Sequence, residues 1–315
     1  DEMISEFKHK GYLEPLEKNV MTEEVRDSFP QKYLESICEE NGHIYSVPFQ
    51  MDIMMFWVNQ ELLKQAGLDE IKNTGDFDIL QKSLKNPDQY AYGDAWENTH
   101  VYNSLSQFVN FWGGDYFDWT DPKTKDAARY MKSMLDEKNT SPAQFVDQYE
   151  QMEEKFIRGK YGCVFMYTSA LGTFLDADVY GKNKIHMAPL PVLHKKKATN
   201  IATWQYVLNN ASENKDAAVR FLQYAAGYEG STEYAKIMKS YPARVDVIEN
   251  EDIDLEGIDM IRKYLREYTL NARPLCENSM GAVSDMGKLF QGYVLGQCEE
   301  DSFFEQAQNC INTYY

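Results

Sequence analysis

Short apolar segments alternate with longer amphipathic segments along almost the whole chain, and this alternation is the strongest constraint on its fold. Residues 54–59, 163–167 and 201–208 have the composition of buried strands, whereas residues 122–136 and 216–228 have the apolar spacing of helices. Strands that alternate with helices indicate an α/β protein. Long helical excursions between few strands favour two lobes joined by crossing strands over one compact sheet.

The length of the chain supports the same expectation, because 315 residues exceed the usual size of one hydrophobic core. We predict a helix over residues 2–9 and a longer one over residues 22–39. Residues 44–49 and 54–59 are predicted as two separate strands, and the chain after about residue 252 as helical throughout.

The charge of the chain excludes some classes of partner. The net charge is −18, whereas nucleic-acid binding needs clustered Lys and Arg to displace counterions from phosphates. The single basic run, at residues 195–197, is most simply a solvated loop. No apolar run approaches the roughly 20 residues of a membrane span.

The five cysteines are scattered at long spacings, without a Cys-x-x-Cys pair or a Cys/His cluster. A zinc site and a dense disulfide framework are therefore not indicated. The odd number implies that at least one thiol is free or pairs outside the chain.

Templates for catalysis and cofactor binding also find no match. The sequence contains neither the Gly-x-Ser-x-Gly of a nucleophile elbow nor a P-loop. Residues 176–187 begin like a calcium-binding loop, but Met187 stands where the bidentate Glu is required. Carboxylates are numerous enough for a glycosidase pair, yet abundance alone does not indicate one. We expect no metal, nucleotide or other cofactor, and no catalytic residues.

A series of short motifs is more informative than any of these templates. It includes Gly-Tyr-Leu-Glu-Pro-Leu at 11–16, the segment from Val47-Pro48 to Asn59, Phe-Ile-Arg-Gly-Lys-Tyr-Gly at 156–162, Met-Ala-Pro-Leu-Pro at 187–191, and Ala-Thr-Trp-Gln-Tyr-Val-Leu at 202–208. Each motif alone is common. Their order and spacing over nearly all 315 residues resemble the extracellular solute-binding proteins of the maltose-binding-like class, the sugar receptors of ABC importers.

This resemblance implies a two-lobed, periplasmic-binding-protein-like (type II) α/β fold with hinge-crossing strands. It places residues 1–48 and 200–250 in the first lobe, and residues 49–199 and 251–315 in the second. The family normally begins with a signal and a first βαβ region before its Gly-Tyr-Leu-x-Pro-Leu segment. That segment begins here at residue 11, so the N-terminal part of the first lobe is expected to be absent from the chain.

The resemblance also implies a function. Such receptors close two lobes over a ligand in the interlobe cleft, which is a two-state equilibrium that the ligand shifts. The expected ligand is a carbohydrate, in particular an oligosaccharide, which a monomeric receptor delivers to ABC permease subunits. The protein is expected to be extracellular, either as a membrane-anchored lipoprotein or in the periplasm.

Four ligand contacts are expected in or near the two segments that should cross between the lobes, the Val-Pro strand at 44–49 and the strand at 201–208. Asp52 follows the Val-Pro strand, with an ordinary turn Asp as the alternative. Trp204, with core packing as its alternative, has the polar neighbour Gln205. Arg244 could donate a bidentate fork to hydroxyls, and a structural salt bridge is an equal alternative. Aromatic rings suit the C–H face of a pyranose, and planar polar groups suit its hydroxyls.

Four further contacts are expected in the segment between these strands. Trp112 and Asp115 flank a Gly-Gly pair that allows close approach of the backbone. Several relatives carry Gly-Pro-Trp after the strand at 163–167, where this chain has Thr-Ser-Ala; Tyr167 and Ser169 are the replacements expected there.

Three alternatives to a sugar receptor remain at this point, and one of them is that the shortened chain is a sensory or nonfunctional remnant. Another is a binding protein of the same fold for another solute, such as a polyol or a sugar acid. The third, less favoured, is an enzyme that acts on glycosides.

Overall fold

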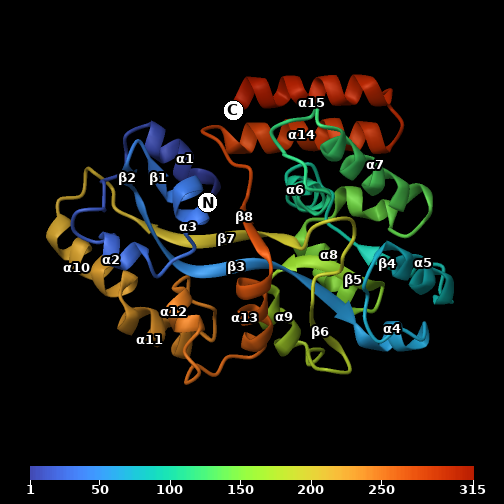
Figure 1. The fold of residues 1–315 in the computed structure, drawn as a ribbon, viewed down its shortest axis with the longest axis horizontal. Coiled ribbons are helices and arrows are strands. Elements are labelled where there is room, and N and C mark those ends of the chain that lie inside the picture. Colours follow the sequence, from blue (N-terminus) through green and yellow to red (C-terminus); the bar gives the residue numbers. More distant parts are fainter. The chain divides into compact units, whose positions relative to one another are not determined.

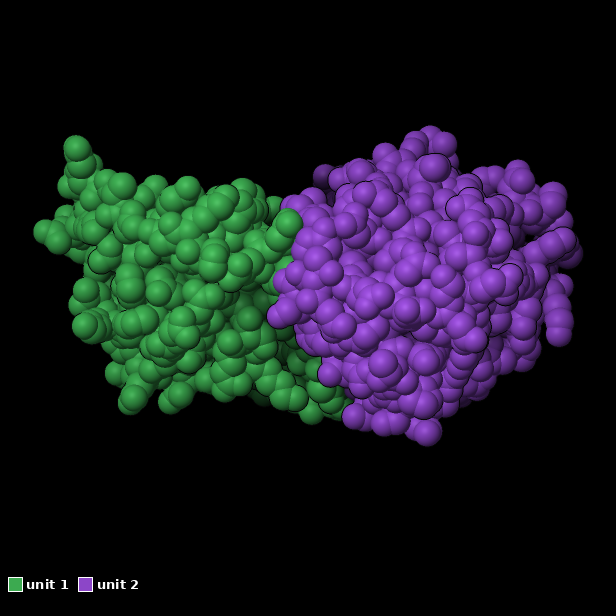
Figure 2. All heavy atoms as spheres, turned by 90° about the horizontal axis from the view of Figure 1, so that it is seen from above, with its two compact units in different colours: residues 1–53, 201–279 green, residues 54–200, 280–315 purple.

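A computed structural model describes residues 1–315, and the chain divides into two compact units. Unit 1 consists of Asp1–Ile53 and Ile201–Ser279, and unit 2 of Met54–Asn200 and Met280–Tyr315. Figure 2 colours the two units separately. The chain therefore passes from one unit to the other three times. The mixed α/β fold with crossing strands that the sequence predicts is confirmed.

Two long strands carry the chain through the first two crossings. They are β3 (Ser46–Asn59) and β7 (Ala198–Val207), which run antiparallel and side by side in Figure 1. The strands of the sheet follow the order β4 (Tyr90–Gly93), β5 (Tyr161–Tyr167), β3, β7 and β8 (Thr269–Ala272), and β6 (Ile185–Ala188) also pairs with β3. Gln50 pairs with Trp204, Asp52 with Ala202 and Ile53 with Ile201. A bulge lies between Pro48 and Gln50.

Unit 1 adds short strands and mostly short helices to its halves of β3 and β7. They are α1 (Glu2–His9), α2 (Glu23–Arg26), α3 (Gln31–Tyr33), the π-helix η1 (Leu34–Cys38), β1 (Glu39–Glu40), β2 (His43–Ile44), α10 (Lys215–Ala226), α11 (Tyr228–Met238), α12 (Val245–Ile248), α13 (Ile258–Glu267) and β8 (Thr269–Ala272).

Unit 2 is richer in helix. It contains α4 (Gln60–Gln65), α5 (Thr74–Ser83), β4 (Tyr90–Gly93), α6 (Val101–Trp112), α7 (Pro122–Asp136), the 3₁₀-helix η2 (Pro142–Val146), α8 (Tyr149–Ile157), β5 (Tyr161–Tyr167), α9 (Ala170–Asp176), β6 (Ile185–Ala188), α14 (Ser279–Val294) and α15 (Glu300–Tyr314). The last two helices lie side by side in Figure 1, and the rings of Tyr293 and Phe303 stack between them at 4.5 Å. No helix is both long enough and apolar enough to span a bilayer.

Three predicted elements differ from the structure. The segments at 44–49 and 54–59 belong largely to one strand, β3, because Gln50 and Asp52 lie within the strand instead of breaking it. The helix predicted over 22–39 is divided at Pro30, whose ring disfavours helical geometry in the preceding residue. Beyond residue 252, β8 interrupts the helices.

The boundaries of the units also differ from those expected, because residues 251–279 belong to unit 1. The guanidinium of Arg262 on α13 donates to the carbonyl oxygens of Ile248 and Asn250, both at 2.8 Å. The hydroxyl of Tyr241 donates to the carbonyl oxygen of Glu256 at 2.5 Å. Helical periodicity does not encode such contacts, so the sequence placed the third crossing too early.

Unit 2 contains a buried carboxylate beside its sheet. Asp94 follows β4 and is fully buried. Its Oδ1 accepts hydrogen bonds from the amide of Ala95 at 2.8 Å and the hydroxyl of Ser104 at 2.6 Å. Its Oδ2 accepts from Tyr92 Oη at 2.7 Å and Trp96 Nε1 at 2.8 Å. Burial raises the pKa of Asp94, and the four donors oppose that rise. The carboxylate thus joins β4, the following loop and α6.

Candidate functional site

The pairing of β3 with β7 places two predicted contacts on one face of unit 1. Directly paired residues of an antiparallel ladder share a face, and residues two apart on one strand share it as well. Because Gln50 pairs with Trp204 and Asp52 with Ala202, the side chains of Gln50, Asp52 and Trp204 all belong to the same face. We call these three residues the β3–β7 face.

Trp204 differs from every other tryptophan of the chain. Of the 5 tryptophans, Trp57, Trp96 and Trp119 are fully buried and Trp112 is 6% exposed, whereas Trp204 is 61% exposed. A tryptophan held in the open by a strand presents a large, rigid apolar surface with a polar N–H, which suits it to contact a ligand. The core-packing alternative for Trp204 therefore does not apply in this structure.

Asp52 lies in the middle of β3, with Met51 and Ile53 buried on either side. Its side chain is only 7% exposed, so it is not an ordinary turn Asp. Taking a carboxylate out of water is costly unless polar groups compensate for it. The β3–β7 face thus includes a carboxylate that the strand holds almost entirely out of solvent.

Gln205 belongs to the opposite face of the ladder, because neighbouring strand residues point to opposite sides. Its Nε2 donates to Tyr33 Oη at 2.5 Å and to Asp1 Oδ1 at 3.2 Å. Its Oε1 accepts from the hydroxyl of Ser46 and from Cys38 Sγ, the latter at 3.3 Å. The amide is thus engaged in a network that ties β7 to η1, β3 and the start of the chain.

This network surrounds a thiol whose reactivity can be tested. Burial raises the pKa of Cys38 to about 12 and that of Cys163 well above its usual value, while Cys276 and Cys298 are half-buried. Since the thiolate is the reactive form, we expect iodoacetamide at pH 8 to label Cys276 and Cys298 but spare Cys38 and Cys163. Peptide mapping by mass spectrometry measures the pattern, and urea-unfolded protein provides the control. Rapid labelling of Cys38 in folded protein would contradict this burial.

Arg244, the remaining predicted contact of unit 1, is buried at the start of α12. Its guanidinium donates to both carboxylate oxygens of Asp246, at 3.0 and 2.6 Å, to the carbonyl oxygen of Ala226 at 2.8 Å, and to Ser28 Oγ at 2.7 Å. These four hydrogen bonds hold the end of α10, the start of α12 and the segment that follows α2 together, and they favour the salt-bridge alternative.

Within unit 2, Trp112 and Asp115 lie at and just beyond the end of α6. The indole of Trp112 is buried and stacks on the ring of His194, with the centroids 4.9 Å apart and the planes 2° apart. Asp115 is exposed, and its Oδ1 accepts from the amide of Phe117 at 2.9 Å within a turn.

Tyr167 and Ser169 lie at the end of β5. The hydroxyl of Tyr167 donates to Asn103 Oδ1 at 2.9 Å near the start of α6, and Ser169 is exposed immediately before α9. Asn103 and Trp112 are nine residues apart on the same helix, a rise of about 13 Å. The two pairs of candidates therefore do not form one cluster.

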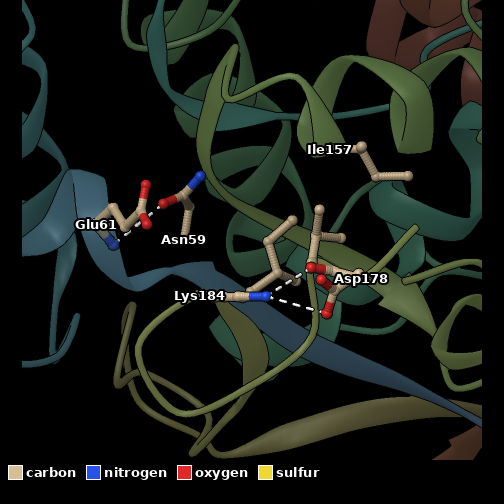
Figure 3. Close-up of a pocket in the computed structure, with 7 residues that line it drawn as sticks. Asn59, Glu61, Ile157, Asp178 and Lys184 are labelled. Atoms are coloured by element: carbon tan, nitrogen blue, oxygen red, sulfur yellow. Dashed lines mark hydrogen bonds and ion pairs between the residues drawn. The ribbon is translucent and has the colours of Figure 1, made fainter. Parts of the chain in front are cut away.

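A shallow pocket of about 190 Å³ in unit 2 contains none of the predicted contacts (Figure 3). It is lined by Asn59, Glu61, Ile157, Asp178, Val179, Lys184 and Ile185. Two of its lining residues bind each other, since Lys184 Nζ lies 3.2 Å from Asp178 Oδ1 and 2.7 Å from the carbonyl oxygen of Asp178. With no exposed aromatic ring, it lacks the composition of a sugar site.

Comparison with known families identifies the class of protein that has this fold. The profile of the family described as bacterial extracellular solute-binding protein matches residues 2–232. The match covers more than half of the chain, and the chain belongs to this family. The resemblance read from the sequence motifs is thereby confirmed.

Individual relatives are distant. An arabinooligosaccharide-binding protein from Bacillus subtilis is 23% identical over 248 residues, 74% of this chain and 56% of that protein. A probable amino-acid ABC transporter periplasmic-binding protein from Sinorhizobium fredii is 24% identical over 239 residues, 72% of this chain and 54% of that protein. The chain thus spans little more than half the length of these relatives.

Among solved structures, a solute-binding protein of an ABC transporter from Thermotoga lettingae, bound with α-D-tagatose, has a similar fold. The TM-score is 0.85 at 18% identity, and the match covers 99% of this chain and 82% of that one. At this identity the similarity establishes the fold and not the ligand.

Proposed function

We propose that the protein is the substrate-binding component of an ABC importer, and that it captures a carbohydrate, in particular an oligosaccharide, at the β3–β7 face. The observation that carries the proposal is the exposed indole of Trp204 on the same strand-pair face as the carboxylate of Asp52. An apolar ring beside directed polar groups matches the two surfaces of a pyranose, its C–H face and its hydroxyls.

The family and the relatives support this proposal. One relative is named for an arabinooligosaccharide, and a protein of similar fold was solved with tagatose. In the proposed role the protein hands its ligand to permease subunits, acts as a monomer outside the cytoplasm as a lipoprotein or in the periplasm, and carries out no catalysis. The predicted ligand contacts in unit 2 remain predictions; they are Trp112, Asp115, Tyr167 and Ser169. Closure of two lobes over the ligand likewise remains a prediction.

Thermal unfolding in the presence of candidate ligands tests the proposal. A ligand that binds only the native state raises the melting temperature, by about 3–6 °C at a hundredfold excess over Kd. The panel contains maltose, maltotriose, arabinotriose, D-tagatose and mannitol, with the common amino acids included because of the amino-acid relative. We expect a rise with at least one oligosaccharide and none with amino acids.

The same samples test the noncatalytic role. Chromatography after prolonged incubation is expected to recover the bound sugar unchanged. Hydrolysis of a chromogenic glycoside that is abolished by substituting a single carboxylate would show instead that the protein is an enzyme. A rise in melting temperature with amino acids alone would replace the carbohydrate by that class of solute.

A further inference from the structure

Gln50 shares the β3–β7 face with the two residues that carry the proposed function. It is the direct cross-strand partner of Trp204, and Asp52 lies two residues further along the same strand. Side chains that are paired in this way have Cβ atoms only about 4.5–5.5 Å apart. A half-buried carboxamide therefore lies beside the exposed indole.

The orientation of this carboxamide is set by α11. The hydroxyl of Tyr234 donates a hydrogen bond to Gln50 Oε1 at 2.5 Å. The ring of Tyr234 meets Phe49 edge-on, with centroids 5.5 Å apart, and Phe49 stacks on Tyr206 at 4.1 Å. The tyrosine is thus held by packing while it engages the amide oxygen.

The backbone around Gln50 is held as well. The amide of Met51 donates to the carbonyl oxygen of Tyr241 at 2.9 Å, and the amide of Ala243 donates to the carbonyl oxygen of Phe49 at 3.1 Å. These bonds span the bulge that precedes Gln50. A bulge commonly serves to aim one side chain of a strand.

One end of the carboxamide stays available. With Oε1 occupied by Tyr234, Gln50 Nε2 makes no hydrogen bond within the protein. An amide fixed by its oxygen presents two N–H donors in a set direction. A sugar hydroxyl oxygen accepts such donors, while the carboxylate of Asp52 on the same face accepts from hydroxyls.

We infer that Gln50 is a specificity-determining contact that donates a hydrogen bond to a hydroxyl of the sugar ring stacked on Trp204, and that Tyr234 is its positioning residue. This inference rests on the proposed function and adds a donor to its site. The site then combines an apolar platform, a donor and an acceptor on one pair of strands. This combination favours a polyhydroxylated ring, which has an apolar face and hydroxyls that both accept and donate hydrogen bonds, over a solute that matches only one of the three groups.

Titration calorimetry tests the inference, with the panel sugar that gives the largest rise in melting temperature as the probe. Losing one hydrogen bond is expected to raise Kd about three- to tenfold in Gln50→Ala. Tyr234→Phe keeps the ring but removes the orienting hydroxyl, and we expect a two- to fivefold rise. Gln223→Ala and Tyr224→Phe alter the same residue types on the exposed surface of α10 and should leave Kd unchanged.

The double variant distinguishes positioning from a purely structural role. If Tyr234 acts through Gln50, Tyr234→Phe has no further effect on Kd once Gln50 is Ala. Equal effects of Tyr234→Phe in both backgrounds would overturn its positioning role. Deoxy analogues of the probe sugar provide a second measurement, because one analogue should bind Gln50→Ala and the unmodified protein equally well.

Failure of the inference is separable from failure of the proposed function. Suppose that a sugar binds, that Trp204→Ala weakens its binding, and that Gln50→Ala leaves Kd unchanged while circular dichroism shows that this variant is folded. The role of Gln50 is then overturned, and the proposed function as a sugar receptor stands. If no sugar of the panel binds the unmodified protein, the proposed function is overturned and the inference falls with it.

Discussion

Asp94→Ala is expected to lower the free energy of unfolding by about 3–5 kcal/mol, the largest effect we predict for a single substitution. The substitution removes the acceptor from four buried donors, namely Tyr92 Oη, Trp96 Nε1, Ser104 Oγ and the amide of Ala95. A buried donor left without a partner keeps its full desolvation cost, so this loss exceeds that expected for removing a single hydrogen bond. Urea unfolding followed by circular dichroism measures the change.

Asp176→Ala is the matched control for this experiment. Asp176 lies in α9 of the same unit, but its carboxylate is exposed. Its substitution should change the unfolding free energy by no more than about 0.5 kcal/mol. A loss below about 1.5 kcal/mol in Asp94→Ala would mean that the donors find other acceptors, contrary to the network described here.

Trp204→Ala is expected to weaken sugar binding by about 1–3 kcal/mol, which corresponds to a rise in Kd of roughly 5- to 150-fold. The ring is 61% exposed, so its removal takes away little packing within the protein. The melting temperature without ligand should therefore change little, while its rise on adding sugar shrinks. Titration calorimetry gives the change in Kd directly.

Tyr224→Ala serves as the control, because Tyr224 is another strongly exposed aromatic residue of unit 1 that lies outside the β3–β7 face. We expect it to bind sugar as the unmodified protein does. Unchanged affinity in a folded Trp204→Ala variant would remove the indole from the site. It would also move the search for the ligand contacts to other residues.

Much of the fold follows from local patterns. The helix at residues 2–9 is found as predicted, and Asp121 caps the helix that begins at Pro122 by accepting from the amide of Lys123. The errors arose where tertiary contacts override local preference. Polar Gln50 and Asp52 looked like a break between strands, although the ladder with β7 continues through them.

The site was less accessible from sequence than the fold. Trp204 and Gln205 were both predicted as ligand contacts, although alternation along a strand puts neighbouring residues on opposite faces. Which of the two faces is exposed follows only from the packing of the whole unit. Gln50 was missed, although its spacing of two residues from Asp52 on a strand was visible. The hydrogen bond from Tyr234 to Gln50 has no signature in the sequence, because it joins residues that lie far apart along the chain. Three of the four donors to Asp94 are its near neighbours in the sequence, but nothing in the sequence shows that they converge on one buried carboxylate.

The route of the chain has a consequence for how the protein is made. Neither unit is one continuous stretch, since residues 54–200 are inserted into unit 1 and residues 280–315 are added to unit 2. A product interrupted near residue 200 would therefore lack part of both bodies. During synthesis residues 1–53 must wait for residues 201–279 before the contacts between these two parts of unit 1 can form. Because the contacts within unit 1 form late, its strand edges stay unpaired for longer. While these edges are exposed, a nascent chain most needs protection from aggregation.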